Sequence, residues 1–380
     1  MKRASFAFGL ARVGLARIGL AAGAGLWLGM LAACEKAPST PTPPTSTTAT
    51  PAPSAAPKDA KPAAGAERAK PAANAQPSTL APKRIAVVPK GTTHEFWKSV
   101  QAGAMQAAEE SDGAVVVTYR GPENENDREQ QISLVQNLIS AKYDAIVLAP
   151  LDSKAMVEPV RQATAAKIPV VIMDSGLEGQ VGKDFVSFVA TDNEVGGKLA
   201  GEKMGEMLKA GGKVLLLRYN EGSSSTALRE KGFVDAVGKI KGLTLVDPKR
   251  YAGTTRATAQ DASENLLSAN PDIAGVFCPN ESSTFGMMLA LRSRGMVGKV
   301  TFIGFDSSPE LVDAMKKGDL AALVLQNPIK MGYLAVKAAA DTLAGKKVEE
   351  RIDTGVAIVT KGTMQTPENQ QLLNPQFGGK

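Results

Sequence analysis

The sequence contains little of what most catalytic and metal-binding sites require. Its 380 residues include one histidine and two cysteines, and aromatic residues make up only 5% of the chain. A single histidine, His94, excludes a metal site with several histidine ligands and makes a histidine-based catalytic triad hard to build. The cysteines, Cys34 and Cys278, lie in an N-terminal leader and at the end of an apolar run, which does not indicate a disulfide framework. We therefore expect no bound metal.

An excess of positive charge is also absent from most of the chain. Nine of the 44 lysine and arginine residues, but only three of the 38 acidic residues, precede residue 83. Residues 83–380 thus contain 35 basic and 35 acidic residues, and the net charge of +6 belongs to the N-terminal segment. A protein that binds nucleic acid needs a basic surface to displace counterions from phosphates. The charge balance predicts that nucleic acid is not a partner.

The N-terminal segment has the pattern of a secretion signal. Lys2 and Arg3 precede an apolar stretch at residues 18–30, which is shorter than the ~20 residues of a transmembrane helix. The stretch leads into the string LAAC, which ends at Cys34 and resembles a bacterial lipoprotein cleavage box. We predict that residues 1–34 are a lipoprotein signal peptide with its lipidation cysteine, and that lipid on Cys34 anchors the protein to a bacterial membrane. The alternative is an ordinary secretion signal.

Residues 35–82 consist mostly of proline, alanine, threonine and serine. Such a composition cannot bury a hydrophobic core and favours extended conformers. We predict a disordered tether that reaches on the order of 100 Å from the membrane.

From Lys83 onward, apolar runs alternate with helical patterns. RIAVVP, DAIVLA and IPVVIM, at residues 84–89, 144–149 and 168–173, are typical of strands buried on both faces of a sheet. A second series of alternating elements begins at residue 193. Repeated strand–helix units predict an α/β fold with two doubly wound parallel-sheet lobes. In such sheets ligands bind beyond the carboxyl ends of the strands.

Polar side chains stand at four of these predicted strand ends: Asp174, Asn280, Asp306 and Gln326. A carboxylate can accept two hydrogen bonds from neighbouring hydroxyls, and an amide can both donate and accept. Together the four indicate a site for a small polyhydroxylated ligand. For Asp174 the alternative is a turn residue bonded to its own backbone.

The segment after the first strand adds two aromatic rings. Thr92 and Glu95 have the spacing of a capping box, which predicts a helix that begins there. Phe96 and Trp97 fall in its first turn, beside the expected site, where an aromatic face can stack on a sugar ring. The alternative is that one or both rings belong to the core.

The strings VVPKGTTHEFW, IPVVIMDSG, VATDNEVGGKLAG, GVFCPNESS, FIGFDSSPE and LVLQNP occur in order along residues 83–360. In them the chain resembles the ribose-binding-protein-like family of periplasmic sugar-binding proteins, the solute receptors of ABC importers. The resemblance implies a type I periplasmic binding protein fold, with two lobes joined by a three-segment hinge near residues 190–191, 326–327 and 355. It implies an N-terminal lobe of residues 83–190 plus 327–355 and a C-terminal lobe of residues 191–326 plus 356–380.

The resemblance also places the sugar site on Phe96, Trp97, Asp174, Asn280, Asp306 and Gln326. It implies an arginine directly after Asp174, where this chain has Ser175, and an aromatic ring near Thr254. Lower-ranking candidates for ligand contacts are Lys90, His94, Ser175, Ser224, Arg229 and Thr254. For Arg229 the alternative is a position on a helix surface.

By this resemblance the protein is a membrane-tethered extracytoplasmic receptor that captures a monosaccharide or similar polyol and delivers it to the permease of an ABC importer. The alternative is a sensor that reports a sugar or an autoinducer-like furanose to a signalling partner. We do not expect an enzyme, since the sequence has neither a dinucleotide-binding nor a phosphate-binding glycine loop. For the same reason no cofactor is predicted.

Overall fold

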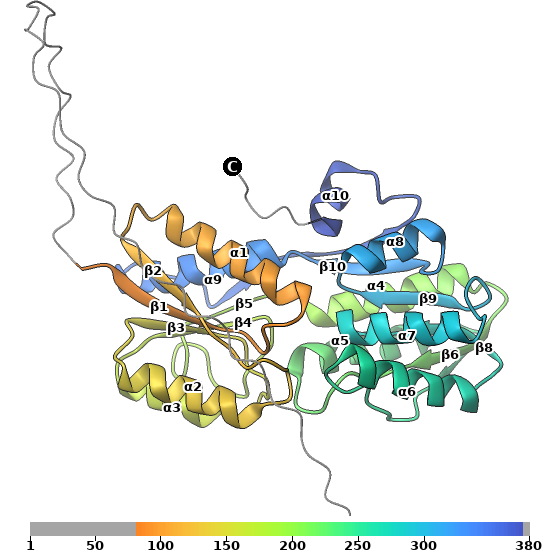
Figure 1. Cartoon of the computed structure of the whole chain (residues 1–380), viewed down its shortest axis with the longest axis horizontal. Coiled ribbons are helices and arrows are strands. Elements are labelled where there is room, and N and C mark those ends of the chain that lie inside the picture. The colour runs from red at the N-terminus through yellow and green to blue at the C-terminus, as the bar shows by residue number, and fades with distance from the viewer. Residues whose placement is uncertain (1–80, 375–380) are drawn as a thin grey trace, which may run out of the picture. The chain divides into compact units, whose positions relative to one another are not determined.

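The computed structural model describes residues 81–374, so the signal peptide, Cys34 and nearly all of the tether lie outside the described residues. The described strands form two six-stranded sheets, each covered by helices (Figure 1). The prediction of two α/β lobes is confirmed. No helix within residues 81–374 is long and apolar enough to cross a membrane.

The first sheet has the strand order β11-β5-β4-β3-β1-β2, and all its pairs are parallel. Together with four helices it forms what we call lobe 1. Its elements are β1 (Lys83–Val88), α1 (Glu95–Glu109), β2 (Val115–Tyr119), α2 (Arg128–Ser140), β3 (Ala145–Leu148), α3 (Val157–Ala165), β4 (Val170–Met173), β5 (Ser187–Ala190), α9 (Pro328–Leu343) and β11 (Arg351–Asp353).

The second sheet has the order β12-β10-β9-β8-β6-β7 and belongs to what we call lobe 2. Its elements are α4 (Asn193–Met207), β6 (Gly212–Leu216), α5 (Ser224–Val237), β7 (Leu243–Val246), α6 (Arg256–Ala269), β8 (Ile273–Phe277), α7 (Glu281–Ser293), β9 (Thr301–Phe305), α8 (Pro309–Lys317), β10 (Ala322–Gln326), β12 (Val356–Thr360) and α10 (Pro367–Leu373).

Alternate residues of each apolar strand enter different cores. In β1, Ile85 and Val87 pack with α1 and α9, whereas Ala86 and Val88 pack with α2 and α3 on the opposite face (Figure 1). Lobe 2 repeats the arrangement, with α4 and α5 on one face and α6, α7 and α8 on the other. Strands buried on both faces need continuous apolar runs, which explains why these segments were recognisable in the sequence.

The chain passes between the two sheets three times: from β5 to α4, from β10 to α9, and from β11 to β12. The last connection consists of Thr354 and Gly355 alone, and Gly355 has a φ of 86°. β12 runs antiparallel to β10, which is the one departure from the predicted parallel sheets among the described strands.

The predicted capping box at the start of α1 does not form. The N-cap is His94, and its side chain makes no capping bond. The Thr92 hydroxyl instead donates to the Pro122 carbonyl at 3.3 Å, and Glu95 pairs with Lys98 at 2.7 Å. This prediction was wrong because Thr92 bonds a carbonyl in a distant loop and Glu95 pairs with Lys98 of the same helix.

Helices α4 and α5 pack with almost no space between their backbones. A Cβ on Gly197 of α4 would lie 1.8 Å from the carbonyl oxygen of Arg229, and one on Gly232 of α5 would lie 2.1 Å from that of Glu194. The two glycines thus allow the close approach that fixes the backbone of Arg229.

We expect Gly197→Ala to lower the free energy of unfolding by about 1–3 kcal/mol, because the added methyl forces the two helices apart. Gly362→Ala is the control, since its Cβ would meet no atom closer than 3.8 Å and its effect should stay within about 0.5 kcal/mol. Denaturant unfolding of both variants measures the difference. Equal effects would contradict the proposed packing constraint.

Candidate functional site

Two carboxylates occupy equivalent positions in the two sheets. Asp174 directly follows β4 and Asp306 directly follows β9, each the third strand in its sheet order. Both have left-handed backbones, with φ values of 60° and 68°. Non-glycine residues seldom adopt this conformation, and its cost of ~1–3 kcal/mol is typically tolerated at ligand sites. The strain marks both aspartates as functional candidates.

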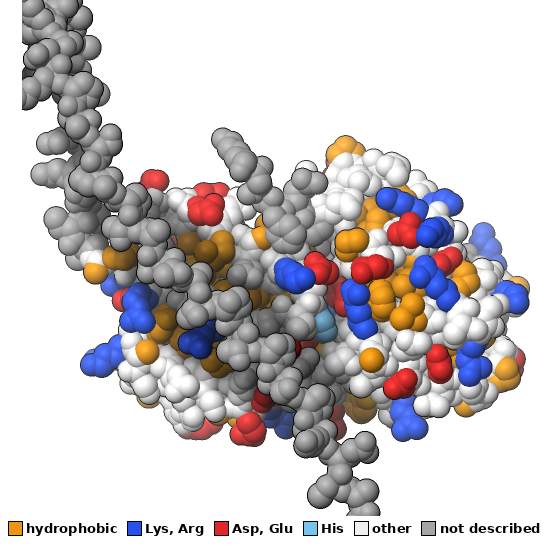
Figure 2. All heavy atoms as spheres, in the orientation of Figure 1, with side chains coloured by type: hydrophobic (Ala, Val, Ile, Leu, Met, Phe, Trp, Pro, Cys, Tyr) orange, Lys and Arg blue, Asp and Glu red, His pale blue; other side chains and the backbone are white. Residues whose placement is uncertain are grey.

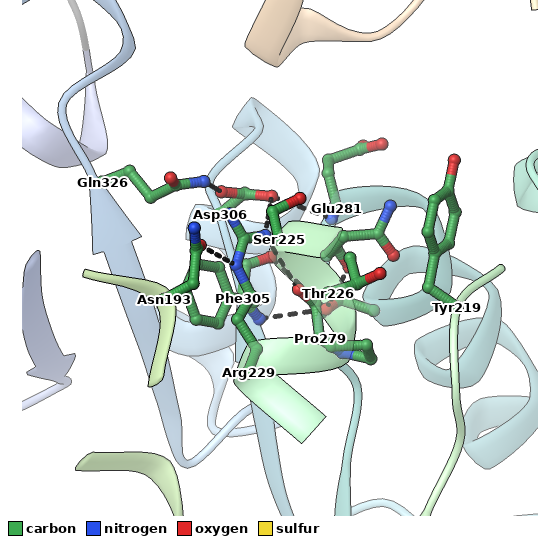
Figure 3. Close-up of polar contacts among 12 residues, drawn as sticks. Asn193, Tyr219, Ser225, Thr226, Arg229, Pro279, Glu281, Phe305, Asp306 and Gln326 are labelled. Carbon is green, nitrogen blue, oxygen red and sulfur yellow. Dashed lines mark hydrogen bonds and ion pairs between the residues drawn. The ribbon is translucent and has the colours of Figure 1, made fainter. Parts of the chain in front are cut away.

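Side chains from both lobes line a single cavity. Figure 3 shows the lobe 2 side of this cavity. Its lining residues are Lys90, His94, Phe96, Trp97, Glu125 and Asp174 from lobe 1, and Tyr219, Ser225, Thr226, Arg229, Asn280, Glu281, Asp306 and Gln326 from lobe 2. All six leading candidates from the sequence are among them.

Asp306 is held by three neighbours. Gln326 Nε2 donates to Asp306 Oδ1 at 2.7 Å, and the backbone N–H of Glu281 donates to Oδ2 at 3.2 Å. Arg229 lies 3.9 Å from the same Oδ2 (Figure 3). Burial raises the pKa of Asp306 to about 6, although the charge of Arg229 and the bond from Gln326 act in the opposite direction. The carboxylate is thus fixed in place with lone pairs left for a ligand.

Arg229 is buried, with 2% of its surface exposed, so the alternative of a helix-surface position is wrong. Its Nε donates to Asn193 Oδ1 at 2.7 Å and its NH1 to the Pro279 carbonyl at 3.0 Å. The guanidinium also lies 4.0 Å from the centre of the Phe305 ring. These contacts orient a planar donor group at the floor of the cavity.

Lys90 links the two lobes. Its Nζ lies 3.3 Å from Asp174 Oδ2 and donates to Ser223 Oγ at 3.2 Å and to Ser225 Oγ at 3.1 Å. The ammonium group is buried, so these three acceptors replace the water that it gives up. Lys90 therefore supports Asp174 and contacts the opposite lobe at the same time.

At the other end of the cavity, the Glu125 carboxylate accepts hydrogen bonds from three side chains. His94 Nδ1 and Trp97 Nε1 each lie 2.8 Å from its Oε1, and the Tyr219 hydroxyl donates to its Oε2 at 2.9 Å. Burial acts to raise the pKa of Glu125, but the bond from His94 and its charge lower it to about 2. Burial likewise disfavours the protonated His94, but the bond to Glu125 and its charge raise the histidine pKa to about 9. The pair is ionised at neutral pH.

His94 is the only histidine of the chain, so its titration can be followed by NMR without ambiguity. We expect its imidazole resonances to titrate near pH 9 rather than 6.5. A raised folded-state pKa stabilises the fold fully below pH 6.5, and this contribution is lost as the pH rises through about 9. Urea unfolding should show a loss on the order of 3 kcal/mol over that range, which His94→Gln should lack. A midpoint near 6.5 would contradict the ion pair.

Asn280 and the aromatic pair serve in the fold as well as lining the cavity. Asn280 caps α7, since its Oδ1 accepts from the Ser283 N–H at 3.3 Å. Phe96 and Trp97 meet edge to face, with ring centres 4.9 Å apart. Trp97 is 2% exposed and belongs to the lobe 1 core. The alternative of a core position is therefore correct for Trp97, although its ring also lines the cavity.

Three lower-ranking candidates do not line the cavity. Ser175 is fully buried, and its Oγ accepts from the Ser225 N–H at 3.1 Å, which joins the lobes. Ser224 packs against Gly176, where an added Cβ would lie 3.0 Å from its Oγ. Thr254 is buried beside the N-cap of α6. The structure thus places these three residues outside the cavity lining, and their contact with a ligand stays a prediction, whereas Lys90, His94 and Arg229 do line the cavity.

Sequence reasoning missed five lining residues: Glu125, Tyr219, Ser225, Thr226 and Glu281. Tyr219 follows β6, so the strand-end rule applied to that strand would have found it. Glu281 directly follows Asn280, one position beyond a predicted contact. Glu125 lies in a loop rich in acidic residues, and nothing in the sequence distinguishes it from them.

A model of the periplasmic binding protein domain matches residues 85–347. The chain belongs to the periplasmic binding protein family. Its relatives include the ribose import binding protein RbsB of Salmonella typhimurium, 31% identical over 285 residues that cover 75% of this chain and 93% of the relative.

Solved structures of the same family resemble this periplasmic binding protein closely. An ABC transporter solute-binding protein from Agrobacterium vitis with bound D-fucose has 38% identity and a TM-score of 0.73, covering 76% of this chain and 99% of its own. A carbohydrate transporter solute-binding protein from Agrobacterium radiobacter in complex with D-arabinose has 35% identity and a TM-score of 0.74, covering 78% and 100%.

These findings confirm the resemblance to ribose-binding-like proteins and the type I fold. They also confirm the prediction of a binding protein rather than an enzyme, since the relatives are binding proteins of transport systems. Within residues 81–374, no cluster of three or more acidic, histidine or cysteine side chains could hold a metal ion.

Proposed function

We propose that this periplasmic binding protein captures a neutral monosaccharide or similar small polyol in the cavity between its lobes and delivers it to an ABC importer. The observation that carries the proposal is the composition of the cavity lining. Acceptors and donors for hydroxyl groups surround this cavity. The cations Lys90, His94 and Arg229 face carboxylates in the same cavity, so a neutral ligand leaves the charges paired.

The relatives support the sugar class. Their bound ligands are D-fucose and D-arabinose, and the curated relative is a ribose import binding protein. Because these ligands differ in hydroxyl orientation, the family likeness supports the class of ligand and leaves the individual sugar to experiment. The family also supports a location outside the cytoplasm.

We further propose that the three crossovers form a hinge between lobe 1, at residues 83–190 plus 327–355, and lobe 2, at residues 191–326 plus 356–380. Direct contacts between the lobes support closure over a ligand. Besides the bonds of Lys90, these are Tyr219 to Glu125 and the Ser153 N–H to the Gly222 carbonyl at 3.1 Å. A ligand that contacts both lobes would favour this closed arrangement over an open one.

A thermal-shift panel of pentoses, hexoses, inositols and furanoses on the purified protein tests the proposal. A ligand at 1,000 times its dissociation constant should add about 4 kcal/mol, or several degrees in the midpoint. A shift with one sugar class supports the function and names the ligand. A cooperative melt with no shift across the panel would refute it.

For residues 1–82 we propose a lipid anchor on Cys34 followed by the tether. Metabolic labelling with a clickable fatty acid should mark the parent chain in its bacterial host, and Cys34→Ser should abolish the label. An unlabelled parent chain would instead favour an ordinary secretion signal.

A further inference from the structure

Within residues 81–374, two buried side-chain atoms have no hydrogen-bond partner: Glu281 Oε2 and Gln326 Oε1. Both residues line the cavity between the lobes. A buried acceptor without a donor costs free energy, and the cost is greatest for a charged group. Since all the unpaired atoms fall in one cavity, we take them as the positions where a ligand supplies donors.

Glu281 is held so that one of its oxygens stays available. It is the first residue of α7 and is 1% exposed. Arg256 Nε donates to Glu281 Oε1 at 3.0 Å, and Arg256 NH2 contacts the same oxygen. Arg256 is itself fixed, because its guanidinium lies 3.9 Å from the centre of the Phe285 ring. Both arginine contacts thus use Oε1 and leave Oε2 without a partner.

The orientation of Glu281 agrees with this role. In Figure 3 its carboxyl end and the Tyr219 hydroxyl point the same way, and Tyr219 reaches Glu125 of lobe 1. Glu281 is also close enough to His94 of lobe 1 for its charge to favour the protonated histidine and raise its pKa. The free oxygen therefore lies where the lobes meet around the cavity.

We propose that Glu281 determines specificity by accepting a hydrogen bond at Oε2 from one ligand hydroxyl. This inference rests on the proposed function, in which the ligand is a neutral polyol. An analogue without that hydroxyl leaves a desolvated carboxylate oxygen unpaired, so the site rejects it. Gln326 Oε1 provides a second acceptor that Asp306 holds in place through Nε2, and the two acceptors fix how the ring is oriented.

A purely structural role for Glu281, as the partner of Arg256, is the competing explanation. The chain offers a matched control, because Glu310 also pairs with Arg256, at 3.4 Å, but is half exposed and does not line the cavity. Glu310→Gln removes a partner of Arg256 without changing the ligand site. Glu281→Gln keeps the side-chain size but replaces one carboxylate oxygen by a donor.

Calorimetric titration of the full chain tests the proposal with D-ribose, D-arabinose, D-allose and D-galactose, and with the monodeoxy form of each that lacks one hydroxyl. For the sugar that binds, we expect one monodeoxy form to bind the parent protein at least about 30-fold more weakly. Glu281→Gln should bind the sugar at least about 10-fold more weakly than the parent protein does. It should also lose most of the parent's preference for the sugar over that monodeoxy form. Glu310→Gln should match the parent protein.

Glu281→Asp covers the case in which Glu281→Gln does not fold. It keeps the charge beside Arg256 but withdraws the carboxylate by one methylene, so discrimination should fall here too. A sugar that binds both the parent and the Glu281 variants with unchanged discrimination would overturn the role of Glu281 and leave the proposed function intact. A parent protein that binds no sugar would overturn the proposed function, and this inference with it.

Discussion

Asp306→Asn is expected to lower ligand affinity at least about 100-fold while the ligand-free protein still folds. The carboxylate can accept two ligand hydroxyls, and each charge-assisted bond contributes about 1.5–3 kcal/mol. Asparagine retains one acceptor oxygen, which the bond from Gln326 already uses, and it adopts the left-handed backbone of this position readily. Asp313→Asn is the control, since that carboxylate is half exposed on α8 and should leave affinity unchanged. A loss of less than about 10-fold in Asp306→Asn would show that the site is misplaced.

Asp306→Asn should also change how the stability of the protein depends on pH. Burial raises the pKa of Asp306 from 3.8 to about 6, so folding favours its neutral form. The stability from this group is fully present below pH 3.8 and is lost as the pH rises through about 6. The stability of the parent relative to Asp306→Asn should therefore fall as the pH rises between these two values, by an amount on the order of 3 kcal/mol. Urea unfolding at acid and neutral pH measures this difference in stability. A difference between the parent and the variant that does not change with pH would contradict a raised pKa.

The site residues at strand ends were predictable because parallel strands bring their carboxyl ends together. Asp174, Asp306 and Gln326 needed only the position of each strand in the sequence. The rule does not depend on loop conformation, which the sequence pattern leaves open. It placed these acceptors and Gln326, which donates to Asp306, but not the loop residue Glu125.

Contacts between the lobes were the part that sequence reasoning could not supply. Glu125 matters because a loop brings it to His94 and lobe closure brings it to Tyr219. Ser175 stands where the resemblance implies an arginine, and it contacts the N–H of Ser225 in the opposite lobe rather than the cavity. Both outcomes depend on how two separately folded lobes meet, which no local pattern encodes.

Arg229→Met is expected to cause the largest loss of stability of the substitutions considered, about 3–5 kcal/mol. Removing the guanidinium leaves the buried Asn193 Oδ1 and the Pro279 carbonyl without this donor, and it takes away the positive charge that lies 3.9 Å from Asp306 Oδ2. Methionine fills much of the volume over Phe305, so the loss measures the polar contacts rather than a cavity.

Arg292→Met provides the matched control, because Arg292 forms its ion pair with Asp319 at a part-exposed position, where such a pair contributes about 0–1 kcal/mol. Arg229→Lys separates charge from geometry, since lysine keeps the charge near Asp306 but cannot donate to Asn193 and Pro279 in the same fork. We expect Arg229→Lys to recover part of the stability and little of the ligand affinity. Because Arg229 counteracts the effect of burial, the pKa of Asp306 should rise further in Arg229→Met. Equal losses of stability in Arg229→Met and Arg292→Met would mean that the buried guanidinium contributes no more to stability than a surface charge does. The stabilising role assigned to the polar contacts of Arg229 would then be wrong.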